Sequence, residues 1–162
     1  MWNDAQKTTT EYDSSPDFSH FPDAFRDVRP FLCESLLVLW KEKYGPVGVI
    51  AGASEGLGAA YAEALASRGL DLILIARRAD VLEEVATRLR DTYSVQIECH
   101  PMDLAQPDLA NRLAAITAVH RIGLGIYNAA YAPVRDFLDS DPADLERILN
   151  VNARGPLVFA RI

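Results

Sequence analysis

Three glycines follow a short apolar run and are spaced so that their backbone could hold a phosphate. The run from Val47 to Ala51 is typical of a buried parallel strand, and Gly52, Gly56 and Gly58 lead from it into a helix-forming stretch. Glycine permits positive φ and lets a ligand approach the backbone. The first turn of a helix carries free N–H groups that attract an anion. The pattern therefore predicts a nucleotide site, and the alternative is a tight turn that binds no ligand.

The spacing Gly-x-x-x-Gly-x-Gly resembles the signature of the short-chain dehydrogenase/reductase family, which is Thr-Gly-Ala-Ser-x-Gly-x-Gly. Only the leading threonine differs here, where Ala51 stands, and the chain has no Gly-Lys-Ser/Thr of a P-loop. The resemblance implies hydride transfer between a nicotinamide dinucleotide and a carbonyl or alcohol. It also implies a first set of cofactor-binding residues, namely Gly52, Ser54, Glu55, Gly56, Leu57 and Gly58.

Two arginines, Arg77 and Arg78, follow the second expected strand at 71–76. In a dinucleotide fold an acidic residue at this place binds the ribose of NAD, whereas an arginine pairs with the 2′-phosphate of NADP. The two arginines therefore favour NADP(H) over NAD(H). Glu55 argues in the other direction, because NADP-preferring members of the family often carry a basic residue there. The alternative is that both arginines end a strand on the surface.

Loops after the third and fourth expected strands extend the resemblance. Asp103 stands where the family has an aspartate that reaches the edge of the adenine ring. The run that begins at Tyr127 resembles Asn-Asn-Ala-Gly, although Tyr127 and Ala130 depart from it, and the second departure restricts φ. The cofactor-binding residues that these loops add are Asp103, Leu104, Asn128, Ala129 and Ala130.

The run Asn-Val-Asn-x-x-Gly at 150–155 resembles another motif of the family, in which Asn152 is the helix asparagine of the catalytic tetrad. Pro156 has no N–H, so the carbonyl four residues earlier loses its partner in an α-helix. A buried carbonyl needs a substitute, usually water, and in the family this position holds the water of a proton relay. The alternative is an ordinary proline kink.

The serine, tyrosine and lysine of that tetrad are missing. In the family the lysine of Tyr-x-x-x-Lys lowers the pKa of the catalytic tyrosine, but the only lysines here are Lys7, Lys41 and Lys43. The nearest imitation, Tyr131-x-x-x-Arg135, follows the fourth strand directly, where the family has a loop. We therefore leave open whether this chain is itself an enzyme.

Alternating strands and helices would position these residues. Strands are expected at 47–51, 71–76, 95–99 and 122–127, and helices at 57–68, 79–91, 107–119 and from 140 or 141 to the end. Alternation of this kind indicates right-handed βαβ units. The expected fold is α/β, a Rossmann-like parallel sheet in the order 3-2-1-4 with flanking helices, truncated before the later strands. The side chains expected to face inward on the second and fourth helices are Val81, Val85, Leu89, Leu145, Ile148 and Leu149.

The chain divides into three parts by composition. Residues 1–30 are expected to be an acidic, flexible extension, because they are polar and lack sustained periodicity. Residues 31–45 are expected to form an amphipathic helix and a linker. Residues 46–162 form the expected dinucleotide-binding domain, which is incomplete.

Composition excludes several functions. The net charge of −7 and a pI near 4.9 argue against a nucleic-acid partner. Two cysteines make no disulfide framework, and no basic segment precedes an apolar stretch, so a cytoplasmic protein without a secretory signal is expected. No apolar run is long enough to span a membrane. The three histidines are scattered, and no metal site is expected.

Two hypotheses follow. The chain is either the NADP-binding part of an oxidoreductase, inactive alone and acting on a carbonyl or alcohol only within a longer parent, or a stand-alone, non-catalytic module that binds NADP or a protein. An uncovered sheet edge and a bare face of the last helix would favour association, including a homo-oligomer. Residues 43–46 and 60–63 resemble the branch with 3-ketoacyl reductases and 17β-hydroxysteroid dehydrogenases.

Overall fold

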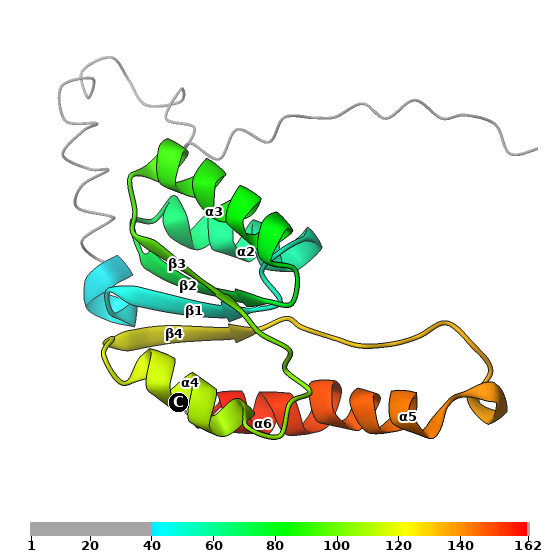
Figure 1. Ribbon diagram of the computed structural model, residues 1–162. Coiled ribbons are helices and arrows are strands. Elements are labelled where there is room, and N and C mark those ends of the chain that lie inside the picture. The colour runs from blue at the N-terminus through cyan, green and yellow to red at the C-terminus, as the bar shows by residue number, and fades with distance from the viewer. Residues whose placement is uncertain (1–39, 162) are drawn as a thin grey trace, which may run out of the picture.

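The computed structural model describes residues 40–161, in which a parallel sheet of order β3-β2-β1-β4 lies between two layers of helices (Figure 1). The elements in chain order are β1 (Val47–Ala51), α2 (Gly56–Ala66), β2 (Asp71–Ala76), α3 (Ala79–Tyr93), β3 (Ile97–Pro101), α4 (Leu109–Thr117), β4 (Ile122–Tyr127), the 3₁₀ turn η2 (Phe137–Asp139), α5 (Pro142–Leu149), the π-helical turn η3 (Asn150–Arg154) and α6 (Gly155–Phe159). The expected Rossmann-like fold is confirmed. The expected extension at 1–30 and most of the expected helix at 31–45 lie outside the described residues.

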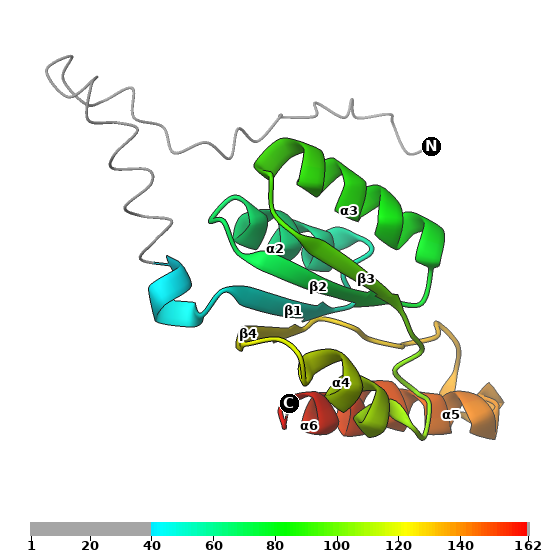
Figure 2. The same ribbon diagram turned by 60° about the vertical axis from the view of Figure 1, so that its left-hand side comes forward.

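The two layers pack on opposite faces of the sheet because β1 and β2 are apolar on both sides, as parallel strands usually are. Ile50, Leu72 and Leu74 are buried against α2 and α3, whereas Val49 and Ile73 are buried against α4 and α6. Figure 2, turned by 60°, shows the same separation of α2 and α3 from α4, α5 and α6. Both faces of the central strands are therefore covered.

All four strands run in the same direction, so their carboxyl ends lie at one edge of the sheet. β1 is paired with β2 on one side and with β4 on the other, and Ala51 is the register partner of both Ile75 and Tyr127. After β3 the chain crosses back to form β4 next to β1. Ligands of such sheets bind outside the carboxyl ends of the strands, where the order reverses.

The end of α3 differs from the sequence prediction. The helix continues to Tyr93 and ends where Ser94 takes a left-handed conformation with φ of 54°. Because the helix is longer than expected, β3 begins at Ile97, two residues later than predicted. The predicted inward face of α3 is also partly wrong, because Leu82 and Ala86 are buried with Leu89, while Val81 and Val85 are half-buried.

The last helix, which runs continuously through α5, η3 and α6, contains one π-helical turn instead of being a single regular α-helix. The Gly155 N–H donates to the carbonyl of Asn150, five residues earlier. In this register the partner of the Val151 carbonyl would be the nitrogen of Pro156, which carries no hydrogen. The hydroxyl of Tyr127 donates to that carbonyl instead, over 2.6 Å. α-Helical spacing predicts that the carbonyl of Asn152 loses its partner to Pro156. The structure shows instead that the carbonyl of Val151, one residue earlier, takes a side-chain partner.

The outer face of the last helix is exposed. Leu145 and Ile148 are half-buried, but Leu149 is 64% exposed, so its predicted inward orientation is wrong. Leu157 is 72% exposed on the same helix. The physical reason is that β4 is the edge strand among residues 40–161, so no further strand or helix lies beyond it in this part of the chain. None of the helices in residues 40–161 is both long and apolar enough to cross a membrane.

Candidate functional site

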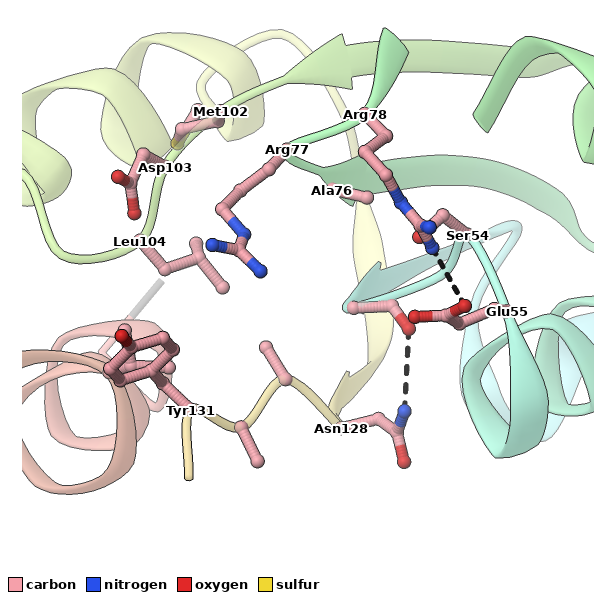
Figure 3. A pocket seen from close by; sticks show the side chains of 14 residues that line it. Ser54, Glu55, Ala76, Arg77, Arg78, Met102, Asp103, Leu104, Asn128 and Tyr131 are labelled. Carbon is pink, nitrogen blue, oxygen red and sulfur yellow. Dashed lines mark hydrogen bonds and ion pairs between the residues drawn. The ribbon is translucent and has the colours of Figure 1, made fainter. Parts of the chain in front are cut away.

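A cleft of about 290 Å³ opens at the carboxyl edge of the sheet (Figure 3), and this volume is near the lower end of the range for ligand sites. The glycine turn contributes Gly52, Ser54 and Glu55 to its lining, and the end of β2 contributes Arg77 and Arg78. The loops after β3 and β4 contribute Asp103, Leu104, Asn128, Ala129 and Ala130. The predicted site residues that do not line the cleft are Gly56, Leu57, Gly58 and Asn152.

The glycine turn packs closely against the loop after β4. Gly52 has φ of +85°, and a Cβ built there would lie 2.6 Å from the backbone nitrogen of Ala129. A Cβ on Gly58 would lie 1.8 Å from the carbonyl oxygen of Gly52. The side-chain amide of Asn128 donates to that same oxygen over 3.3 Å. Glycine is therefore required at both positions by the close approach of the backbone.

Gly56 is different, because its surroundings are open. Its φ is +53°, and a Cβ built on it would meet nothing within 4 Å. Helix α2 begins at this residue, and Glu55 at its N-cap makes no side-chain hydrogen bond to the first turn. Open space at the N-terminus of this eleven-residue helix fits a phosphate group. Leu57, in the same turn, is 68% exposed.

The two arginines after β2 have different partners. Arg78 forms an ion pair with Glu55 over 2.7 Å between Nη2 and Oε2, and both side chains are well exposed. Arg77 instead extends into the cleft toward Asp103 and Leu104 (Figure 3). Within residues 40–161 no ion pair of Arg77 is found. Of the two charges, that of Arg77 is therefore the one available to an anion.

Asp103 is held at both carboxylate oxygens. Oδ1 accepts the backbone N–H of Ala105 over 3.0 Å, and Oδ2 is 2.6 Å from Nη2 of Arg147. Partial burial acts to raise the pKa of this carboxyl, but the Ala105 N–H, the Arg147 guanidinium and the charge of Arg77 outweigh it, so the pKa is lowered. Asp103 is therefore a fixed hydrogen-bond acceptor at neutral pH.

The side chain of Asn152 is engaged by the loop after β4. Its Nδ2 donates to the carbonyl of Tyr131 over 2.8 Å, and its Oδ1 accepts the N–H of the same residue over 2.9 Å. The amide therefore fixes the backbone of this loop with two hydrogen bonds. Membership of Asn152 in a catalytic tetrad stays a prediction.

The hydroxyl of Tyr131 is bound to a carboxylate. It donates to Oδ1 of Asp144 over 2.5 Å, while Arg135 pairs with Oδ2 of the same carboxylate over 3.1 Å. The hydrogen bond to Asp144 raises the pKa of Tyr131. A tyrosine that serves as a general acid/base in the family needs the opposite shift. The Tyr131-x-x-x-Arg135 spacing thus places both residues around an aspartate and does not reproduce the family's pair.

Sequence reasoning missed four residues that line the cleft, namely Ala76, Met102, Tyr131 and Val151. Ala76 and Met102 precede predicted residues directly, so the strand ends alone could have indicated them. Val151 belongs to the last helix, which a connection of 14 residues (128–141) separates from β4. The sequence signal for that helix at the cleft is the family resemblance of the Asn-Val-Asn run, in which Val151 stands next to Asn152.

The chain matches the sequence model of the short chain dehydrogenase family over residues 46–162. It is 37% identical over 115 residues to a 7beta-hydroxysteroid dehydrogenase of Clostridium sardiniense, covering 71% of this chain and 44% of that protein. It is 34% identical over 129 residues to a very-long-chain 3-oxoacyl-CoA reductase of Podospora anserina, covering 74% of this chain and 38% of that protein. The chain therefore spans less than half the length of these relatives.

A solved structure agrees with these matches. The short-chain dehydrogenase from Sphingobium yanoikuyae in complex with NADPH superimposes with a TM-score of 0.64 and 35% sequence identity, covering 72% of this chain and 46% of that one. The resemblance drawn from the glycine turn and the later loops is confirmed.

Proposed function

Because the chain belongs to the short-chain dehydrogenase family, we propose that it is the NADP(H)-binding part of an oxidoreductase. The parent activity is hydride transfer between the nicotinamide and a carbonyl or alcohol, and the cofactor supplies the hydride chemistry when it is bound. The observation that carries the proposal is the cleft itself. It brings the glycine turn, the free cation of Arg77 and the fixed acceptor of Asp103 to one edge of the sheet.

The residues of the cleft and of the adjoining start of α2 fit the parts of a dinucleotide. The open space over Gly56 at the start of α2 suits the pyrophosphate. The carboxylate of Asp103 suits a hydrogen-bond donor of the adenine, and Asn128 holds the glycine turn in place through the Gly52 carbonyl. The small side chains of Ala129 and Ala130 line the cleft without filling it.

A preference for NADP(H) is part of the proposal, and Arg77 supports it. A 2′-phosphate needs a cation at the end of β2, and Arg77 extends into the cleft there. Arg78 is already paired with Glu55 and contributes less charge to the cleft. This pairing also accounts for an acidic residue in the glycine turn, because Glu55 neutralises one arginine and leaves the other free.

This chain by itself is proposed to be catalytically inactive. Among its 162 residues there is no Tyr-x-x-x-Lys, and only Asn152 matches the tetrad. The pKa of Tyr131, the nearest imitation, is raised by Asp144, which removes it from the role of an acid/base near neutral pH. The carbonyl or alcohol substrate would be bound and turned over only within a longer protein.

Association with a further surface is also proposed. The exposed side chains of Leu149 and Leu157 lie on the last helix, and β4 has a single neighbour in the described part of the chain. Exposed apolar residues and an open strand edge favour contact with more protein. A second copy of the chain and the remainder of a longer parent are the two candidates.

Calorimetric titration of the purified chain with NADPH and with NADH tests the proposal, with sedimentation of the same sample to define the species. Micromolar binding of NADPH and weaker binding of NADH on a discrete species is the expected result. Binding of neither dinucleotide to a discrete species would contradict the proposal and favour a module that binds another protein.

A further inference from the structure

Two arginines of the last helix reach across to the loop that follows β3. Arg147 on α5 forms the 2.6 Å ion pair with Asp103. Arg154 in η3 donates from Nη1 to the carbonyl of Gln106 over 2.9 Å and from Nη2 to that of Pro107 over 2.6 Å. Both arginines hold the same loop, but only Arg147 contacts a residue that lines the cleft.

Arg147 has a second contact, on the loop after β4. The carbon of its guanidinium lies 5.1 Å from the ring centroid of Tyr131, within the range of a cation–π interaction. The ring is fixed from two other directions, because its hydroxyl donates to Asp144 and its backbone is bound by Asn152. One side chain thus joins the loop after β3 to the loop after β4.

The contacts of Arg147 are partly shielded from water. Its side chain is 29% exposed and that of Asp103 is 25% exposed, so their ion pair is less screened than the Arg78–Glu55 pair on the rim. A planar guanidinium can bond a carboxylate at its edge while its face lies over an aromatic ring. A lysine ammonium could keep the charge near Asp103 but lacks this planar group.

We propose that Arg147 is a positioning residue of the dinucleotide site, which holds the Asp103 carboxylate and the Tyr131 ring in the orientation that receives the adenosine half. The inference rests on the proposed function, because it assigns the adenosine end of the cofactor to this part of the cleft. Arg154 has a different role, since it fixes the same loop through backbone carbonyls outside the cleft. The two arginines therefore form a matched pair for an experiment.

The test compares Arg147→Met with Arg154→Met, using adenosine 2′,5′-bisphosphate as the probe in calorimetry. We expect Arg147→Met to weaken binding of this probe by roughly tenfold, because a hydrogen bond to a charged group contributes on the order of 1.5 kcal/mol. Arg154→Met should leave the affinity within about twofold. Loss of affinity to the same extent in both variants would show that Arg147 has only a structural role and would overturn the proposal.

A pH titration of the Asp103 carboxyl by NMR gives a readout that needs no ligand. Arg147 lowers the pKa of this carboxyl, so Arg147→Met should shift its titration to higher pH, while Arg154→Met should not. Arg147→Lys should keep the Asp103 pKa nearly as low as Arg147 does, but it should bind the probe less tightly than the unsubstituted chain. An unshifted titration in Arg147→Met would overturn the inference. If the unsubstituted chain bound neither a dinucleotide nor the probe, the proposed function would be contradicted, and the inference that rests on it would be overturned as well.

Discussion

The two walls of the cleft differ in the groups that form them, backbone in one wall and ionised side chains in the other. The glycine wall is the turn that holds Gly52, Gly56 and Gly58, of which Gly52 lines the cleft itself. It is made of backbone, and its shape depends on the absence of side chains. The charged wall, formed by Arg77, Arg78 and Asp103 with their partners, is made of ionised side chains. Steric exclusion does not depend on salt, whereas exposed charge pairs are screened by it. A substitution in the glycine wall should therefore abolish dinucleotide binding outright. A substitution in the charged wall should reduce the affinity by a graded amount.

The largest effect should come from adding a methyl group to the glycine wall. Gly58→Ala would place Cβ 1.8 Å from the Gly52 carbonyl oxygen, so we expect a loss of about 3 kcal/mol in unfolding free energy and no dinucleotide binding. Gly56→Ala is the matched control for the fold, because its Cβ meets nothing, and only its φ of +53° costs about 1–2 kcal/mol. Its dinucleotide binding should still be lost, because the methyl group occupies the phosphate space.

Urea unfolding and calorimetry on both glycine variants would check this. If Gly58→Ala were as stable as the parent, the glycine wall would be less rigid than its geometry indicates. If Gly56→Ala kept full affinity, the open space above the start of α2 would not be the phosphate site.

The next effect should come from the free cation of the charged wall. Arg77→Ala is expected to weaken NADPH binding by roughly 10- to 100-fold, because a hydrogen bond to a charged group contributes about 1.5–3 kcal/mol. NADH has no 2′-phosphate and should bind Arg77→Ala about as well as the parent. Arg78→Ala should reduce the affinity for NADPH by less than Arg77→Ala does, since Arg78 is paired with Glu55. Equal losses for NADPH and NADH in Arg77→Ala would contradict the preference, and calorimetry measures both.

A smaller effect should come from the hydroxyl that supports the last helix beneath the cleft. Tyr127→Phe removes the donor to the Val151 carbonyl, and we expect the unfolding free energy to fall by about 1 kcal/mol. Burial raises the pKa of Tyr127 to about 12, so the hydroxyl stays protonated at neutral pH and this bond is retained. Tyr61→Phe on the exposed face of α2 is the control. Equal stability of the two variants in urea would show that the bond contributes nothing.

The smallest effect should be a gain. Glu55→Gln removes the partner of Arg78 and leaves a second free cation on the charged wall, so NADPH should bind about two- to fivefold more tightly. The gain should shrink as salt is raised, because both side chains are exposed. Glu84→Gln, an exposed change on α3, is the control for net charge. Weaker NADPH binding by Glu55→Gln would show that Glu55 contributes to NADPH binding instead of withholding Arg78 from it.

Much of the glycine wall could be predicted from the sequence because its determinants are local. The apolar run, the glycines and the following helix are contiguous, and the glycine spacing indicates the turn without knowledge of any distant residue. The strand order and the strand-end residues Arg77, Asp103 and Asn128 follow from alternation of strands and helices and from the family resemblance. Local patterns suffice where the chain itself fixes the geometry.

The charged wall could be predicted only in part, because its partners come from distant segments. The sequence shows Arg77 and Arg78 as equivalent, and only the position of Glu55 distinguishes them. The pair between Asp103 and Arg147 joins residues 44 positions apart, across a long loop whose path no local pattern determines. The burial of Leu149 was wrongly predicted for a related reason, since helical periodicity identifies an apolar face but not what covers it.

The π-helical turn of the last helix has a consequence for how this segment tolerates changes of length. One residue of an α-helix corresponds to a rotation of about 100°. Deleting a residue between Asn150 and Arg154 would restore a regular helix but would rotate α6 by that angle. Phe159, whose ring lies 5.5 Å from that of Tyr127 and against Gly125, would then leave the core. The segment should therefore accept many substitutions on its outer face but no single-residue deletion, because the packing of Phe159 sets its length.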